Sequence, residues 1–129
     1  RLIPGPYTFI LPCTKAVPNY AHDPKRNTVG IRVPHATIAN AILTSLAEPL
    51  ISITAKDADG NEFATVQQAV ESIGTTVDVV VIMQKFSWME DDYFTGESTI
   101  IDMTSNDFTV LRAGANASEV LELIGQEAE

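Results

Sequence analysis

Residues 28–34, with the sequence TVGIRVP, constrain the fold most because they separate apolar from polar side chains residue by residue. Valine and isoleucine alternate with Thr28, Gly30 and Arg32, which is the period of a β-strand with one face toward a core. The opposite face presents a hydroxyl group, a gap above the glycine and a guanidinium group. This face suits an extended polar ligand lying along the strand. An edge strand whose arginine reaches solvent explains the same pattern, and both interpretations stay open.

The periodicity of the remaining sequence predicts an alternation of strands and helices. We predict strands at residues 7–11, 50–54, 77–83, 98–103 and 108–112, the last two forming a hairpin. The run at 77–83 is apolar almost throughout and is typical of a central strand covered on both faces. Helices are predicted between Pro34 and Pro49, from Thr65 to Gly74, and from Asn116 onward, where Glu119 would complete a capping box. We expect the first helix to pack on the sheet, and residues 85–95 to form a loop, so the chain is predicted to be an α/β protein.

Composition and charge exclude several classes of protein. A chain of 129 residues with 45% hydrophobic residues suits one domain with a core. Its formal charge of −9 argues against non-specific binding of nucleic acid over the whole surface, although a local basic patch is compatible with that total. The single cysteine, Cys13, excludes an intrachain disulfide and indicates a reducing, cytoplasmic compartment. No run approaches the ~20 apolar residues of a membrane span, so we expect no membrane insertion.

Motifs for metal binding and for nucleophilic catalysis are weak. The loop at residues 57–62 partly matches a calcium loop, but its glycine falls too early and the closing glutamate is absent. The acidic residues at 90–92 could hold a metal, yet a surface turn explains them more simply. Cys13 and His22 could form a thiol pair, but nothing in their spacing places them together. We therefore predict no metal site formed by side chains alone.

Small hydroxyl residues and arginines recur on the predicted strands. Hydroxyl groups donate to anionic oxygens and a guanidinium group binds them through a fork of N–H groups, so this set predicts a site for carboxylates or phosphates. The six candidates are Thr28, Arg32, Ser52, Thr54, Ser98 and Arg112. We expect the strand faces that carry the first four of them to line one concavity.

Four segments in order along the chain resemble a known family. They are residues 4–11 (PGPYTFIL), 25–34 (KRNTVGIRVP), 97–102 (ESTIID) and 110–114 (VLRAG). Together they resemble the YrdC/YciO-like domain, closest to its YciO branch. The resemblance implies an open, twisted, mixed β-sheet flanked by helices, with a concave ligand-binding face. Residues 1–129 would be the C-terminal portion of one such domain, without the family's N-terminal portion and its lysine- and arginine-bearing motifs.

The resemblance also implies an activity and a role for each candidate. Characterised members of the family make threonylcarbamoyl-AMP from L-threonine, bicarbonate and ATP, with Mg²⁺ expected alongside ATP, for the modification of transfer RNA. The family motifs imply that Arg112 is the catalytic electrostatic residue. By the same motifs, ATP contacts would be Thr28, Thr54 and Arg112, and L-threonine contacts would be Arg32, Ser52 and Ser98. Lys56 stands where the family motif has asparagine, which exchanges an amide for a point charge.

A second class of function stays open beside this enzyme. The family has also been described as binding double-stranded RNA, so the chain could be a non-catalytic module for nucleotides or RNA. The charge of −9 favours the enzyme.

The RNA interpretation makes a prediction about salt. Protein side chains that contact many phosphates displace the counterions of the nucleic acid, so affinity for double-stranded RNA should fall by orders of magnitude between low and moderate salt. Electrophoretic mobility shifts over a salt series measure this dependence. Absence of binding even at low salt would contradict the RNA-module interpretation.

Overall fold

The computed structural model describes residues 1–82 and 96–125 of the chain. The chain divides into two compact units. The first comprises Arg1–Glu48 and Asp91–Glu129, and the second comprises Pro49–Glu90. The prediction that all 129 residues form one family domain stays a prediction.

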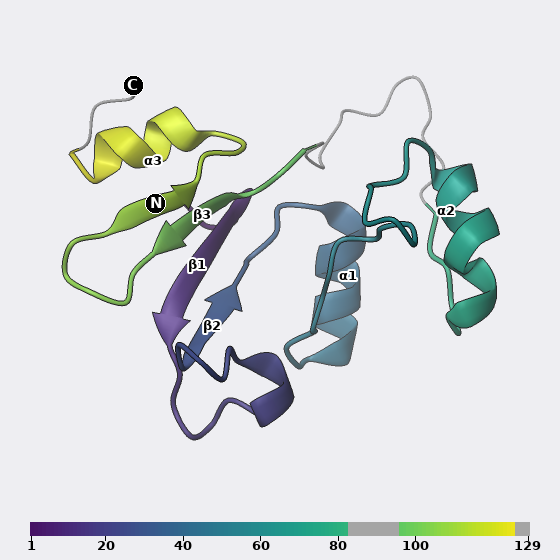
Figure 1. The fold of residues 1–129 in the computed structure, drawn as a ribbon, viewed down its shortest axis with the longest axis horizontal. Helices are drawn as coiled ribbons and strands as arrows, with labels where there is room; N and C mark the ends of the chain where they lie inside the picture. The colour runs from purple at the N-terminus through teal and green to yellow at the C-terminus, as the bar shows by residue number, and fades with distance from the viewer. Residues whose placement is uncertain (83–95, 126–129) are drawn as a thin grey trace. The chain divides into compact units, whose positions relative to one another are not determined.

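The first unit is built on a mixed, open sheet of four strands, as predicted for an α/β chain (Figure 1). The strands are β1 (Tyr7–Pro12), β2 (Thr28–Ile31), β3 (Thr99–Asp102) and β4 (Thr109–Arg112), in the order β2-β1-β3-β4. Strand β1 pairs antiparallel with β2 and parallel with β3, whereas β4 is antiparallel to β3. The predicted hairpin of β3 and β4 is therefore confirmed.

A longer connection between β1 and β2 ends in a hydrogen-bonded turn at residues 23–27. After the short 3-10 helix η1 (Asn19–Ala21), the Asp23 carboxylate accepts hydrogen bonds from the backbone N–H of Lys25 (2.8 Å) and of Arg26 (3.2 Å). These two bonds hold the pKa of the Asp23 carboxyl below its usual range. Asn27 then adopts left-handed backbone angles (φ 54°), which asparagine tolerates better than most residues. This hydrogen-bonded turn thus fixes where β2 begins.

The core of the first unit lies between the sheet and α3 (Ala117–Leu123). Tyr7, Ile101 and Val120 are its buried members. The Tyr7 hydroxyl donates to the carboxylate of Glu119 at 2.9 Å, which ties α3 to β1. Asn116 precedes the helix as predicted but makes no capping hydrogen bond with its side chain, because its backbone is left-handed (φ 56°) rather than extended. The predicted capping box is therefore wrong, and Glu119 serves the core instead.

The apolar face of β2 is half-exposed. Strand β2 ends at Ile31, so Arg32 and Val33 lie just beyond it. Ile31 is 43% exposed and Val33 is 40% exposed. Both line an open apolar groove of about 580 Å³, together with Phe9, Leu11 and side chains of α3. The predicted apolar face is present, but within residues 1–82 and 96–125 it is not covered as a core.

The helix predicted between Pro34 and Pro49 forms α1 (Thr37–Leu46). Ala47 ends it in left-handed backbone geometry and donates its N–H to the carbonyl of Leu43 at 2.9 Å. No residue of α1 is buried, so the close packing that we predicted between this helix and the sheet is not found. An apolar stripe is buried only where a second surface meets it. None of the helices in the described part of the chain is long and apolar enough to cross a membrane.

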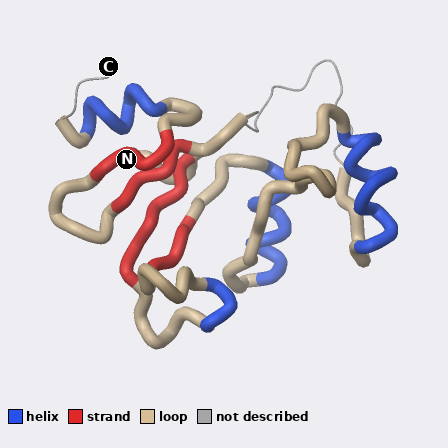
Figure 2. Tube along the Cα trace, viewed as in Figure 1, coloured by secondary structure: helices blue, strands red, loops and turns tan. Residues whose placement is uncertain are grey.

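The second unit contains α2 (Val66–Ile73) followed by the 3-10 helix η2 (Gly74–Thr76). Thr65 caps α2 as predicted, since its hydroxyl oxygen accepts a hydrogen bond from the backbone N–H of Gln68 at 3.1 Å. The strands predicted at 50–54 and 77–83 are wrong over 50–54 and 77–82, which Figure 2 shows as loop. Ile53, in the first of them, is 92% exposed. A strand needs a neighbouring backbone for its hydrogen bonds, and within 49–82 the structure shows only an isolated bridge between Lys56 and Glu62.

The acidic loop at residues 57–62 is a hydrogen-bonded turn. The Asp57 carboxylate accepts hydrogen bonds from the backbone N–H of Asn61 (2.8 Å) and of Asp59 (2.9 Å), which lowers the pKa of that carboxyl. Within residues 1–82 and 96–125, no three His, Cys, Asp or Glu side chains gather where they could hold a metal ion. The predicted loop at 85–95, with its acidic residues, lies outside the described residues.

The core hydrogen bond of Tyr7 predicts a dependence of stability on alkaline pH. Burial and, next, the bond to Glu119 raise the pKa of Tyr7 above its usual value of 10.0. The folded state therefore favours the protonated phenol, so this stabilisation is complete below pH 10.0 and is lost as the pH rises through the folded pKa. We expect Tyr7→Phe to lower the free energy of unfolding by ~1 kcal/mol at neutral pH. The variant should also lose less of this free energy than wild type as the pH rises above 10.0.

Thermal unfolding followed by circular dichroism at several pH values measures both effects. Tyr20→Phe is the matched control because the Tyr20 side chain is exposed. Identical pH profiles for wild type and Tyr7→Phe would contradict the role given to Tyr7.

Candidate functional site

The register of the sheet gathers polar side chains on the face opposite the core. Directly paired residues in a sheet project their side chains to the same face. Ile10 pairs with Gly30, and Ile100 pairs both with Thr8 and with Arg112. Thr8, Gly30 and Arg112 therefore share one face, whereas Tyr7 and its core neighbours lie on the other. Thr28 lies two residues before Gly30 and so faces the same way.

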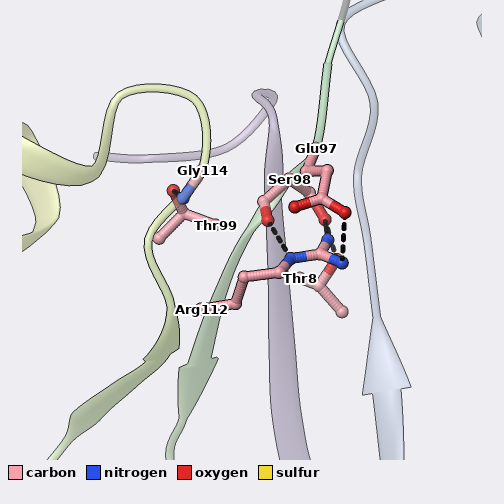
Figure 3. A network of polar contacts seen from close by, with 6 residues as sticks. All are labelled: Thr8, Glu97, Ser98, Thr99, Arg112 and Gly114. Carbon is pink, nitrogen blue, oxygen red and sulfur yellow. Dashed lines mark hydrogen bonds and ion pairs between the residues drawn. The ribbon is translucent and has the colours of Figure 1, made fainter.

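Arg112, at the end of β4, is held by the residues that precede β3 (Figure 3). Its Nε donates to the backbone carbonyl of Ser98 at 3.0 Å, and its Nη2 donates to the Ser98 Oγ at 2.9 Å. Its Nη1 lies 3.7 Å from a carboxylate oxygen of Glu97. The Arg112 side chain is 39% exposed, so a guanidinium group that is fixed along one edge still reaches solvent. A positioned cation of this kind can bind a phosphate or a carboxylate.

The Ser98 hydroxyl connects Arg112 to the central strand β1. Ser98 is buried, and its Oγ lies 2.9 Å from the Oγ1 of Thr8. Arginine only donates, so the Ser98 oxygen accepts from Arg112 and the two hydroxyl groups share the remaining hydrogen-bonding capacity. Sequence reasoning missed Thr8, although its position on the polar side of the predicted strand at 7–11 was a usable signal. The three residues form one network across β1, β3 and β4.

A second set of contacts clamps the loop after β4 against the segment before β3. The buried Thr99 hydroxyl donates to the carbonyl of Ala115 (2.7 Å) and accepts from the backbone N–H of Gly114 (3.0 Å). The Ala115 N–H donates to the carbonyl of Glu97 at 2.9 Å. A Cβ atom on Gly114 would lie 2.3 Å from that carbonyl oxygen, so only glycine permits this approach. The clamp sets the position of Arg112, two residues earlier, and sequence reasoning missed both Thr99 and Gly114.

Asp102 is the acidic residue of β3 on the same face of the sheet. It pairs with Ile10 in the parallel ladder. Its carboxylate accepts from the Thr104 hydroxyl (2.6 Å) and the Thr104 backbone N–H (2.9 Å), and these bonds hold the pKa of the Asp102 carboxyl below its usual range. Asp102 is thus an ionised cap of the hairpin turn rather than a base poised near neutral pH.

The structure brings two of the predicted site residues into contact, and the other four lie on other segments of the chain. Ser98 and Arg112 are in direct contact, and Thr28 lies on the same face of the same sheet. Arg32 is exposed just past the end of β2. Ser52 and Thr54 are exposed and belong to the second compact unit. The hypothesis that all of them line one concavity stays a prediction.

The clamp around Gly114 predicts a large effect of a single methyl group. We expect Gly114→Ala to destabilise the protein by about 1–3 kcal/mol, because the new Cβ meets backbone atoms that cannot turn away. Gly74→Ala is the control, since Gly74 has ordinary helical angles and its added Cβ would lie 3.4 Å from a Val70 methyl group. Urea unfolding of both variants measures the difference, and equal stability of the two would contradict the clamp.

Comparison with known proteins places the chain among relatives. The Sua5/YciO/YrdC family model, described as "Telomere recombination", matches residues 1–114. The protein YciO of Escherichia coli K12, named as uncharacterized, is 35% identical over 115 residues, which is 86% of this chain and 51% of that protein. An uncharacterized protein of Haemophilus influenzae is 34% identical over 116 residues, covering 89% of this chain and 53% of that protein.

Solved structures agree with the sequence comparison. The crystal structure of E. coli YciO matches with a TM-score of 0.71 at 30% identity, covering 90% of this chain and 53% of that one. The structure of P. abyssi Sua5 complexed with L-threonine matches with a TM-score of 0.69 at 24% identity, covering 97% and 35% of the two chains, and this likeness shows the fold. The chain spans about half the length of the curated relatives that it matches. By its match over residues 1–114, this chain belongs to the Sua5/YciO/YrdC family.

Proposed function

We propose that this chain carries the anion-binding side of an adenylate-forming site that makes threonylcarbamoyl-AMP from L-threonine, bicarbonate and ATP. The observation that carries the proposal is the guanidinium group of Arg112, held by two hydrogen bonds to Ser98 and still 39% exposed. Membership of the Sua5/YciO/YrdC family supports the choice of this reaction. The presence of L-threonine in the structure of P. abyssi Sua5 supports threonine as the amino-acid substrate.

Arg112 would act by binding a phosphate group of ATP. Formation of the adenylate requires a carbamate oxygen to attack the α-phosphorus while pyrophosphate leaves with additional negative charge. A cation held in advance stabilises this charge without rearranging during the reaction, and one such donor is typically worth ~3–4 kcal/mol. The bonds from Nε and Nη2 to Ser98 restrict the guanidinium group in this way.

The other candidates would position the two substrates. Ser98 lies against Arg112 and would contact L-threonine, and Thr28 lies on the same face of the sheet and would contact ATP. The remaining assignments rest on the family motifs alone. They are Arg32 and Ser52 for L-threonine and Thr54 for ATP.

The charge of Arg112 supports ATP as the ligand of this site. The exposed N–H groups of Arg112 match phosphate oxygens in charge and geometry. Residues 1–82 and 96–125 contain no group of three His, Cys, Asp or Glu side chains that could hold a metal ion. Mg²⁺ would therefore be held chiefly by phosphate oxygens and water, as is usual for this ion, and would neutralise part of the pyrophosphate charge.

This proposal predicts that the 129-residue chain alone does not complete the reaction. It spans about half the length of its relatives, and losing one side of a positioning site costs orders of magnitude in rate. We expect weak ATP binding by the chain alone, and threonine-dependent release of pyrophosphate only from the protein expressed from its complete reading frame. Equal rates for the two proteins would contradict the proposal that the site is shared.

Substitution of Arg112 in the complete protein tests its role. We expect Arg112→Ala to lower the rate of pyrophosphate release about 10²–10³-fold, as for loss of one positioned electrostatic donor. Arg112→Lys should recover only part of this loss because lysine keeps the charge but lacks the fork of N–H groups. Arg26→Ala is a control for charge, since the Arg26 side chain belongs to the turn before β2. Undiminished turnover by Arg112→Ala would remove the role that we give to this arginine.

A further inference from the structure

Glu97 places a negative charge beside the cation that is proposed to bind the ligand. Its carboxylate oxygen lies 3.7 Å from Nη1 of Arg112, and Figure 3 shows the two side chains facing one another. This distance is longer than a good hydrogen bond, so the contact is mainly the attraction of opposite charges. The activity proposed above gives Glu97 no task.

The guanidinium group of Arg112 has two usable edges, and the two are occupied differently. The edge formed by Nε and Nη2 is bound to Ser98, through its carbonyl at 3.0 Å and its Oγ at 2.9 Å. The other edge is formed by Nη1 and Nη2, and among the described residues the Glu97 carboxylate lies beside it. A phosphate group that binds Arg112 through two oxygens would use this second edge, because the first is already engaged.

We propose that Glu97 competes with the ligand for Arg112, so that an incoming anion binds the Nη1–Nη2 edge by displacing the Glu97 carboxylate. This inference rests on the proposed function of Arg112 as an anion contact. It adds that the site holds its own internal anion when no ligand is bound.

The competing contact is weak enough to be displaced. The Glu97 side chain is 61% exposed and that of Arg112 is 39% exposed, and ion pairs in such settings contribute little to stability. The Glu97 main chain is held by a hydrogen bond from the Ala115 N–H to its carbonyl at 2.9 Å. The side chain can therefore turn away while the backbone stays, and its charge remains close enough to oppose a bound anion.

The test is the affinity for inorganic pyrophosphate and for ATP, measured by isothermal titration calorimetry at low salt. Glu97→Gln should bind both about two- to fivefold more tightly than wild type, because an amide of similar shape removes the competing charge. Glu122→Gln is the matched control, since it makes the same change in net charge on α3. The gain in affinity should shrink as the salt concentration rises, because salt screens the carboxylate charge. A purely structural effect of Glu97 would not depend on salt concentration in this way.

Arg112→Gln separates this inference from the proposed function. In that background Glu97→Gln should have no effect, as expected for two residues that act through one contact. Equal or weaker binding by Glu97→Gln, while wild-type binding depends on Arg112, would overturn the competition and leave the proposed function standing. Binding that survives Arg112→Gln, or no binding by either wild type or Glu97→Gln, would overturn the anion site and the competition together.

Discussion

The parallel pairing of β1 with β3 is the constraint on which the rest of the first unit depends. It brings the Thr8 hydroxyl within 2.9 Å of the Ser98 hydroxyl, although 90 positions separate them in the sequence. Parallel neighbours cannot be joined by a tight turn, so a long stretch of chain must connect the end of β1 with the start of β3. Here that stretch contains β2, α1 and the whole second unit. Both the core and the Arg112 network exist only once these two strands have paired.

The same pair of strands contributes to the core on one face and to the polar network around Arg112 on the other. Tyr7 enters the core while Thr8, the next residue, joins the network around Ser98. Thr99 follows Ser98 in the same way and clamps the loop after β4. A shift of one residue between the strands would exchange these faces, so the core that selects the register also places the polar groups. Packing of Tyr7 and positioning of Arg112 are thus linked through one register.

Polar clamps carry much of the organisation because the buried apolar core in the described residues is small. Tyr7, Ile101 and Val120 are the buried hydrophobic residues within 1–82 and 96–125, while Ile31 and Val33 stay half-exposed in the apolar groove. Hydrogen bonds made by Thr99 and Tyr7 then hold loops and α3 to the strands. A buried polar group must keep its partner or lose free energy, so these bonds are specific as well as stabilising. They fix the loop and the helix that follow Arg112.

The sequence alone determined the features that depend on near neighbours. Alternation predicted β1, β2 and the hairpin, apolar spacing predicted α1, and Thr65 predicted the start of α2. Short motifs singled out Ser98 and Arg112 as candidates, and the structure places these two in contact. Only the tertiary structure decided what depends on distant partners. The strands predicted at 50–54 and 77–83 lacked a neighbouring backbone over their described residues, and Glu119 bonded to Tyr7, 112 positions away, rather than capping its own helix. Likewise, Gly114 is required by the carbonyl of Glu97 across the sheet. Local periodicity follows from backbone geometry within a few residues, whereas the partner of a strand, a hydroxyl or a carboxylate is chosen only when the register between remote segments is set.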